Sequence, residues 1–244
     1  MKWTRYGTVS QLTFLPRIFP VNCYLVEEED GLTLVDCALP YSAKGILATA
    51  ERIGKPITRI VITHAHDDHV GALDKLKQAL PQAPVYIAAR EARILSGDTS
   101  LDRNEPAAPL RGGLPRGLAT RADVLLHDGD RVGSLLTVAA PGHSPGMTAF
   151  LDTRNAVLLA GDAYVTRGGI AVSGTLKLGF PFPAWATWHK PTALASARRL
   201  LALSPSLLAC GHGPMLSAPG AAMERAIMEA ERRLAPADAE ESVR

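Results

Sequence analysis

The chain has 244 residues, of which 47% are hydrophobic and 20% are charged, and its formal net charge is +2. This length and balance are typical of a soluble α/β protein with one sizeable core, and they exclude disordered and fibrous classes. Basic residues form no stripe, and no apolar run approaches the roughly 18 residues of a membrane span. We therefore expect a small-molecule substrate, with neither nucleic acid nor membrane as partner.

Strand and helix signals alternate along the first third of the chain. Short apolar runs predict strands at residues 21–28, 32–36, 57–63 and 85–88. The turn at residues 29–31 predicts a hairpin between the first two. Helical spacing predicts one helix that starts after Ser42 and ends at Gly54, and a second helix from about 70 to 80.

The remaining chain contains two irregular stretches among further strands and helices. Residues 96–121 and 167–188 are rich in proline and glycine, and we expect both to be lid-like loops. Strands are predicted at 124–126, 135–140, 147–152, 156–160 and 207–210. Helices are predicted from after His189 to Leu203 and at 219–234, and residues 236–244 are predicted to be a solvated tail. Neither a repeat nor a linker is visible, so residues 1–244 are expected to form a single domain.

The N-terminus and the cysteines bear on the location of the protein. Residues 1–13 include Lys2 and Arg5 but no continuous apolar stretch after them, which argues against a secretory signal. The three cysteines form no CxxC pair, and they are Cys23, Cys37 and Cys210. We interpret them as buried free thiols in a reducing compartment, so the expected location is cytoplasmic.

A dense cluster of imidazoles and carboxylates follows the strand predicted at 57–63. It reads Thr63-His64-Ala65-His66-Asp67-Asp68-His69-Val70-Gly71. In an extended loop, side chains two residues apart point the same way, so His64 and His66 can reach one ion together. Asp68 and His69 turn toward a neighbouring position as the next helix begins. So many polar groups beyond a buried strand need a cation to offset their desolvation, and this donor set suits zinc, manganese or iron.

Three later loops add candidate ligands, each at the end of a predicted strand and each directly after a glycine. These ligands are His143, Asp162 and His212. The glycine permits the backbone turn that a strand end requires. A single Gly-His pair would be read as an ordinary polar turn, but together with the cluster it predicts a metal site. The full candidate set is His64, His66, Asp68, His69, His143, Asp162 and His212.

These motifs resemble those of the metallo-β-lactamase superfamily, and the resemblance covers about residues 21–214. It implies an α/β fold, a four-layer αββα sandwich with the site at one edge of two sheets. It also implies two metal ions, with Asp162 bridging them. One ion would be held by His64, His66 and His143, and the other by Asp68, His69 and His212.

Zinc is the favoured metal, with iron and manganese as alternatives. Two ions about 3.5–4 Å apart can share a hydroxide that attacks a carbonyl, while one ion stabilises the charge that develops on its oxygen. Asp162 would fix the spacing of the ions and can also relay a proton. The expected protein is therefore a dinuclear metal-dependent hydrolase.

The substrate is less well defined by the sequence. Similar acyl-homoserine lactonases have a tyrosine three residues after the bridging aspartate, where this chain has Val165. Tyr164 is one residue earlier and would face the opposite way in a strand. Little chain follows His212 for the glutathione-binding region of glyoxalase II, the missing export signal argues against a true β-lactamase, and the charge balance argues against ribonuclease Z. We therefore expect a lactonase-like enzyme that cleaves an ester, lactone or thioester.

Two other classes stay open. One is a non-hydrolytic, iron-binding member similar to persulfide dioxygenases, although those proteins tend to use one iron and fewer ligands. The other is a binding protein with an inactive site, which is disfavoured because no ligand is missing. The sequence does not indicate the oligomeric state.

Several residues near the ligands have two interpretations. Asp67 is either an acceptor that orients a ligand imidazole, and so part of the catalytic set, or the N-cap of the following helix. Phe180, Phe182 and Trp185 are candidates for either the pocket wall or the core. His189 is a further candidate for the pocket wall.

Overall fold

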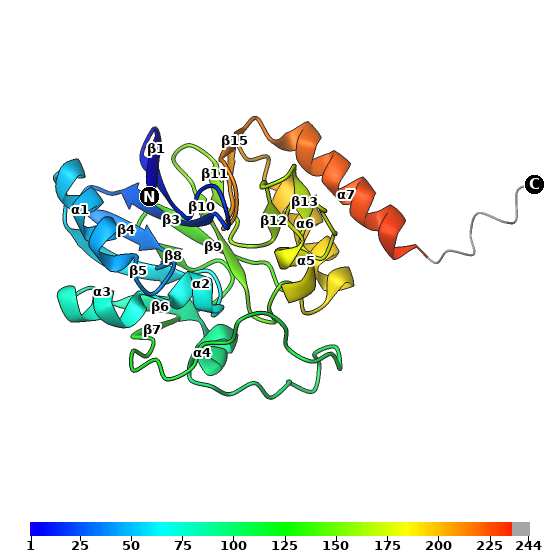
Figure 1. Ribbon diagram of the computed structural model, residues 1–244, viewed down its shortest axis with the longest axis horizontal. Helices are drawn as coiled ribbons and strands as arrows, with labels where there is room; N and C mark the ends of the chain where they lie inside the picture. The colour runs from blue at the N-terminus through cyan, green and yellow to red at the C-terminus, as the bar shows by residue number, and fades with distance from the viewer. Residues whose placement is uncertain (236–244) are drawn as a thin grey trace, which may run out of the picture.

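The computed structural model describes residues 1–235, and two β-sheets form its centre (Figure 1). The first sheet has seven strands, which lie side by side in chain order. They are β1 (Lys2–Tyr6), β2 (Val9–Phe14), β3 (Val21–Glu27), β4 (Leu32–Val35), β5 (Ile57–Ile62), β6 (Val85–Ala88) and β7 (Val124–Leu126). The pairs from β1 to β4 are antiparallel, and those from β4 to β7 are parallel.

The second sheet has six strands in the order β15-β14-β11-β10-β9-β8. They are β8 (Arg131–Val132), β9 (Leu135–Ala139), β10 (Thr148–Asp152), β11 (Val157–Leu159), β14 (Leu207–Ala209) and β15 (Leu216–Ser217). Its pairs are antiparallel except for β11 with β14. A separate two-stranded ribbon consists of β12 (Tyr164–Val165) and β13 (Ala171–Val172).

Helices cover the outer face of each sheet. Those of the first half are α1 (Ala43–Ile53), α2 (Asp67–Val70), α3 (Leu73–Ala79) and α4 (Ala89–Leu95). Those of the second half are α5 (Phe182–Ala186), α6 (Lys190–Ala202) and α7 (Gly220–Leu234). In Figure 1, α1 and α3 lie on one side of the paired sheets and α6 and α7 on the other. The four-layer αββα sandwich is therefore confirmed.

Three apolar clusters hold these layers together. The first packs Ile46 of α1 and Leu76 of α3 against the outer face of the first sheet. The second packs Leu200 of α6 and Met223 of α7 against the second sheet. The third fills the space between the two sheets. Because apolar clusters fill the three interfaces between the layers, burial of apolar surface at ~25 cal/mol per Å² is the main force that holds the layers together.

Strand β5 shows how the sequence produces this packing. Ile60 and Ile62 belong to the outer cluster, whereas Val61 between them belongs to the cluster between the sheets. Side chains alternate across a strand, so an unbroken apolar run buries both faces. The prediction of a strand covered on both sides is confirmed.

Two predicted helices differ in detail from the structure. Helix α1 ends at Gly54, which has a φ of 82°, as predicted, but the Ser42 hydroxyl accepts a hydrogen bond from Leu39 N and caps no helical amide. The single helix expected at 70–80 is wrong, because Gly71 and Ala72 separate α2 from α3. A side chain at Gly71 would meet the Pro40 ring at 2.7 Å, so only glycine fits there. The backbone stays helical at Gly71 and departs from the helix at Ala72, which has a φ of -94° and a ψ of 4°.

The lengths of the helices and the state of the three cysteines are also visible in the structure. Within residues 1–235, no helix is both long and apolar enough to cross a membrane. The three thiols are free and fully buried, and burial raises the pKa of each well above its usual value. They are Cys23, Cys37 and Cys210. Their interpretation as buried free thiols is confirmed.

Candidate metal centre

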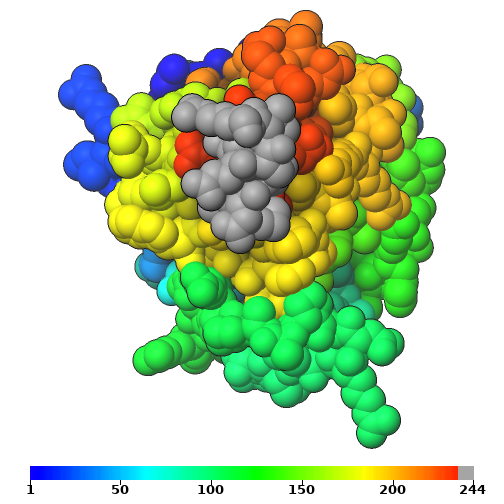
Figure 2. Space-filling view, turned by 90° about the vertical axis from the view of Figure 1, so that its right-hand side faces the viewer, coloured from blue at the N-terminus to red at the C-terminus, as the bar shows by residue number. Residues whose placement is uncertain are grey.

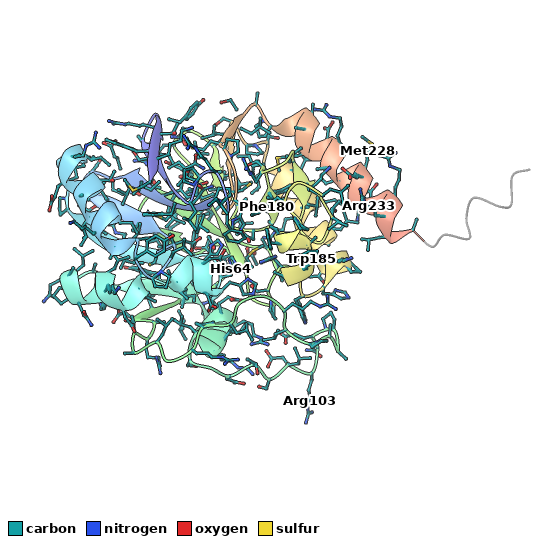
Figure 3. All side chains as sticks on the ribbon, viewed as in Figure 1. His64, Arg103, Phe180, Trp185, Met228 and Arg233 are labelled. Atoms are coloured by element: carbon teal, nitrogen blue, oxygen red, sulfur yellow. The ribbon has the colours of Figure 1, made fainter. Side chains whose placement is uncertain are left out.

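All seven predicted ligands come together at one edge of the two sheets. His64 and His66 lie in the loop between β5 and α2, and Asp68 and His69 lie within α2. The other three follow strands of the second sheet, with His143 after β9, Asp162 after β11 and His212 after β14. Figure 3 shows His64 in the middle of the molecule, between the two halves of the fold. The site is thus built from loops that both sheets supply.

Three of the imidazoles form what we call the three-histidine group, which consists of His64, His66 and His143. His66 Nδ1 lies 3.2 Å from His64 Nε2 and 3.1 Å from His143 Nε2. Zinc bound tetrahedrally to nitrogen places two ligand nitrogens about 3.3 Å apart. The spacing within this group therefore suits a single small cation.

The second set, which we call the mixed group, consists of Asp68, His69 and His212. His212 Nε2 lies 3.4 Å from Asp68 Oδ2 and 3.2 Å from Asp162 Oδ2. Asp162 also faces the three-histidine group, since its Oδ2 lies 3.4 Å from His143 Nε2. This carboxylate therefore lies between the two groups, the position of a bridging ligand.

The ring nitrogens that point away from the site have protein partners. Asp36 Oδ2 lies 2.8 Å from His69 Nδ1, and Ser173 Oγ lies 2.9 Å from His143 Nδ1. Backbone carbonyls do the same for two other rings, with Pro20 O at 2.7 Å from His212 Nδ1 and Arg111 O at 2.8 Å from His66 Nε2. Such contacts fix the orientation of each ring and leave its other nitrogen free for a metal.

Two observations show that the residues present fit metal ions. His69 Nε2 and Asp162 Oδ1 are buried and have no hydrogen-bond partner among residues 1–235, although a buried polar atom without a partner is costly. Burial lowers the pKa of His143 to about 3 and that of His64 well below its usual value. Both rings are then neutral at pH 7, which is the form that binds a metal.

A glycine beside the site meets a requirement of space. Gly211 precedes His212, and any side chain there would overlap Asp162 Oδ1 and would also reach the His69 ring. The predicted reason, a backbone turn that requires glycine, does not apply here, because the φ of Gly211 is not positive. Close approach of the backbone to two ligands is the physical reason instead.

A cleft of about 410 Å³ opens above both groups. Its floor includes His66, Asp68, His143, Asp162 and His212. Aromatic side chains form what we call the rim, which consists of Phe19, Phe182 and Trp185. The lining within the described residues contains neither lysine nor arginine. Such a cleft favours an apolar, uncharged substrate portion next to the metals.

Four of the five residues with open interpretations lie in the cleft, in the core or at a helix end. Phe182 and Trp185 line the cleft, whereas Phe180 is only 2% exposed and packs on the His212 ring with centroids 5.3 Å apart. In Figure 3, Phe180 and Trp185 both lie toward the helical layer of α5 and α6. His189 caps α6, because its ring accepts a hydrogen bond from Thr192 N.

Asp67 lies in the wall of the cleft. It is the first residue of α2, and its backbone N–H donates to Gly113 O at 2.8 Å. Within residues 1–235 its carboxylate accepts a hydrogen bond neither from a ligand imidazole nor from a helical amide. Burial raises its pKa. Its position over the cleft is therefore the observation on which a catalytic role depends.

The loop expected at 96–121 lies against the site. No helix or strand occurs from 96 to 123, and this segment lies beside the one that carries α5 (Figures 1 and 2). Besides the Arg111 contact, the Trp188 indole N–H donates to Ala108 O at 2.8 Å. The second expected loop, 167–188, is not irregular throughout, since it contains β13 and α5.

Comparison with known proteins agrees with this geometry. The sequence model that describes the metallo-β-lactamase superfamily matches residues 16–212 of this chain. The chain belongs to this superfamily, and it is a metallo-hydrolase. The Bacillus subtilis (strain 168) protein YobT is 53% identical over 232 residues, which are 95% of this chain and 100% of that protein. The probable metallo-hydrolase YflN of the same organism is 30% identical over 79% of this chain and 80% of its own.

More distant similarities extend to a thioesterase and to solved structures. The hydroxyacylglutathione hydrolase of Fuscovulum blasticum is 30% identical over 70% of this chain and 54% of that protein. The structure of TTHA1623 in a di-iron-bound form is 30% identical, with a TM-score of 0.62 over 86% of this chain and 95% of that one. The B3 metallo-β-lactamase BLEG-1 is 24% identical, with a TM-score of 0.63 over the same shares, and supports the fold alone.

Proposed function

We propose that the protein is a dinuclear, zinc-dependent hydrolase of small esters or thioesters, with lactones as the third substrate class. The observation that carries the proposal is the cleft, whose floor includes members of both ligand groups, while its rim is aromatic and its lining within residues 1–235 contains neither lysine nor arginine. Ligand sites of this kind are mostly apolar, with a few polar groups that fix orientation. We expect the substrate to bind with an apolar acyl group against Phe182 and Trp185 and its carbonyl toward the floor.

Two divalent ions held here would lower the pKa of a water molecule and polarise the carbonyl of the substrate. The three-histidine group and the mixed group would each hold one of them. Asp162 faces both groups and would fix their separation, and its second oxygen can hold the proton that the attacking water loses. Asp67 in the cleft wall can hydrogen-bond the leaving group or the water. The aromatic rim would exclude bulk water from the floor.

The cleft separates this proposal from two related activities. Tyr164 OH donates to Ala197 O at 2.8 Å and is buried in the second helical layer, so the phenol of acyl-homoserine lactonases has no counterpart in the cleft. Glutathione carries two carboxylates, and the lining offers no cationic side chain to pair with them. Simple acyl esters and thioesters therefore agree best with the lining.

The test combines metal analysis with a substrate panel. Metal-free protein is reconstituted with zinc, manganese or iron and assayed on esters, thioesters and lactones of graded acyl length. We expect two equivalents of metal at saturation and the fastest turnover on uncharged apolar acyl substrates. Full activity with one bound ion, or a preference for substrates that carry a carboxylate beside the carbonyl, would contradict the proposal. Iron is included because a similar protein is known in a di-iron form.

A further inference from the structure

One buried carboxylate lies next to the metal centre without belonging to it. Glu91 is in the first turn of α4, and its side chain is fully buried. Glu91 Oε2 accepts a hydrogen bond from Ala65 N at 2.8 Å. Its Oε1 accepts two more, from Ser144 Oγ at 2.7 Å and from Gly146 N at 2.8 Å. Burying a carboxylate is costly unless its oxygens are hydrogen-bonded, and here three donors supply those bonds.

The three donors come from two loops that carry metal ligands. Ala65 lies between His64 and His66 in the loop after β5 of the first sheet. Ser144 follows His143 in the loop between β9 and β10 of the second sheet. Glu91 therefore joins the two loops that together provide all three imidazoles of the three-histidine group.

This connection acts where the sheets themselves no longer set the distance. At the strand ends below, Thr148 N donates directly to Thr63 O at 2.9 Å, which ties the first sheet to the second. The ligands lie in the loops beyond that point, where His66 Nδ1 and His143 Nε2 must stay about 3 Å apart to share an ion. Because metal–ligand distances vary by only about 0.2 Å, a small opening between the loops weakens the site.

The close approach of the second loop to α4 is itself built into the sequence. A side chain at Gly146 would meet Arg90 Cβ at 2.5 Å and Glu91 N at 3.0 Å. Glycine is thus required for the His143 loop to come within hydrogen-bond distance of the Glu91 carboxylate.

We propose that Glu91 is a positioning residue of the three-histidine group, which holds the His64–His66 loop and the His143 loop at the separation that one metal ion requires. The proposal concerns metal binding alone, so it can be tested whatever substrate the enzyme hydrolyses.

The variant is Glu91→Gln, which keeps the shape of the side chain but turns one acceptor oxygen into an amide that cannot accept from an N–H donor. Metal-free protein is titrated with zinc in competition with a chelating dye. We expect the affinity of the three-histidine group to fall about tenfold or more, as for other partners that orient metal ligands. Affinity of the mixed group should change little. The titration is repeated in the Asp68→Asn background, where only the three-histidine group keeps all its own ligands.

Glu28→Gln is the matched control. Glu28 is also a buried carboxylate that joins the two sheets, because its Oε1 accepts from Ser134 N at 3.1 Å and from Ser134 Oγ at 2.8 Å. It lies at the β3–β4 turn, at the end of the sheets away from the histidines. This variant should lower the melting temperature and leave both zinc affinities unchanged.

Unchanged affinity in Glu91→Gln, or an equal loss in both variants, overturns the proposal. If Glu91→Gln does not fold, Ser144→Ala decides instead, because it removes one donor from the His143 loop alone. A weaker three-histidine group at an unchanged melting temperature then supports the proposal, and unchanged affinity overturns it. Absence of hydrolysis in the parent protein would contradict only the proposed function.

Discussion

The floor of the cleft and its rim differ in how firmly the protein holds their side chains. On the floor, the rings of His143 and His212 are each oriented by a hydrogen bond on the side away from the cleft, and beneath them the buried His69 ring is oriented by Asp36. On the rim, Phe182 is 47% exposed and Trp185 is 62% exposed, and their ring contacts are with other aromatic side chains. Burial and hydrogen bonding therefore fix the ligand side chains in place. The rim side chains, which would select the substrate, are exposed and add little to the packing of the fold.

Loss of the Asp162 carboxylate from the floor should cause the largest loss of hydrolysis. Asp162→Ala removes a carboxylate that faces both ligand groups, so we expect hydrolysis to fall by several orders of magnitude with loss of bound metal. Asp67→Ala is the comparison, because Asp67 lines the cleft and, within residues 1–235, accepts no hydrogen bond from a ligand imidazole, so its loss should be the smaller one, about 100-fold, the lower range for a group that moves a proton. Steady-state kinetics with metal analysis measures both, and equal losses would mean that the two roles are wrongly assigned.

A smaller effect on the floor should follow from Asp36→Asn. Asp36 accepts from Thr63 N and contacts His69 Nδ1, both at 2.8 Å, and asparagine tolerates its φ of 61°. The amide cannot accept from both donors, so metal affinity should fall about 10- to 100-fold. Asp152→Asn is the control. Asp152 is also a buried aspartate, but it pairs with Arg154 and lies at the end of β10 away from the metal site. The control should melt earlier while its zinc titration matches that of the parent.

The contact between the 96–123 loop and the floor can be tested with a pair of glycines. Gly112 and Gly117 both have positive φ values, of 90° and 71°, so alanine costs roughly 1–2 kcal/mol of backbone strain at either position. Only at Gly112 would the new Cβ meet the His66 ring, at 2.5 Å, while Gly117 faces open space. We expect Gly112→Ala to lose about tenfold in metal affinity beyond any loss in Gly117→Ala. Identical titrations of the two variants would show that this loop does not control His66.

The smallest effects should appear at the rim. Phe182→Ala and Trp185→Ala should change relative rates along an acyl-length series by about tenfold or less, with metal content and melting temperature near those of the parent. Phe180→Ala is the contrast, because this ring is buried against His212, and its truncation should cost about 3–5 kcal/mol of stability. If the rim variants melt far lower and keep the chain-length preference of the parent, the two aromatics belong to the core.

Strands that are continuous apolar runs were predictable from the sequence. Strands that contain polar residues were not. The strand β2 was missed because it contains Ser10, Gln11 and Thr13, yet all three are buried. Gln11 is accommodated by hydrogen bonds to Tyr24 OH and Gly213 O, partners that no local pattern reveals. The break between α2 and α3 was missed because the backbone is still helical at Gly71 and departs from the helix only at Ala72, a residue type that favours helices.

The ligands were predictable as a set, and the groups that orient them were not. Four ligands are close together in the sequence, and the other three share the signal of a polar residue after a glycine at a strand end. Their partners include the Pro20 and Arg111 carbonyls, which carry no residue-type signal at all. Asp36 could have been recognised, because an aspartate directly after a buried strand needs a partner. Ser173 and Glu91 could not, since their contacts depend on how the two sheets are placed against each other.

The buried cysteines can be used to measure how often the native structure opens locally. Cys37 N donates to His69 O at 2.6 Å, so it contacts the backbone of a candidate ligand. The Cys210 carbonyl, two residues before His212, accepts from Asn22 and Tyr24. Thiols that are fully buried, with raised pKa values, cannot react until the surrounding structure opens. The rate at which a thiol reagent labels the native protein therefore measures the frequency of that opening, and each metal ion bound should slow the labelling.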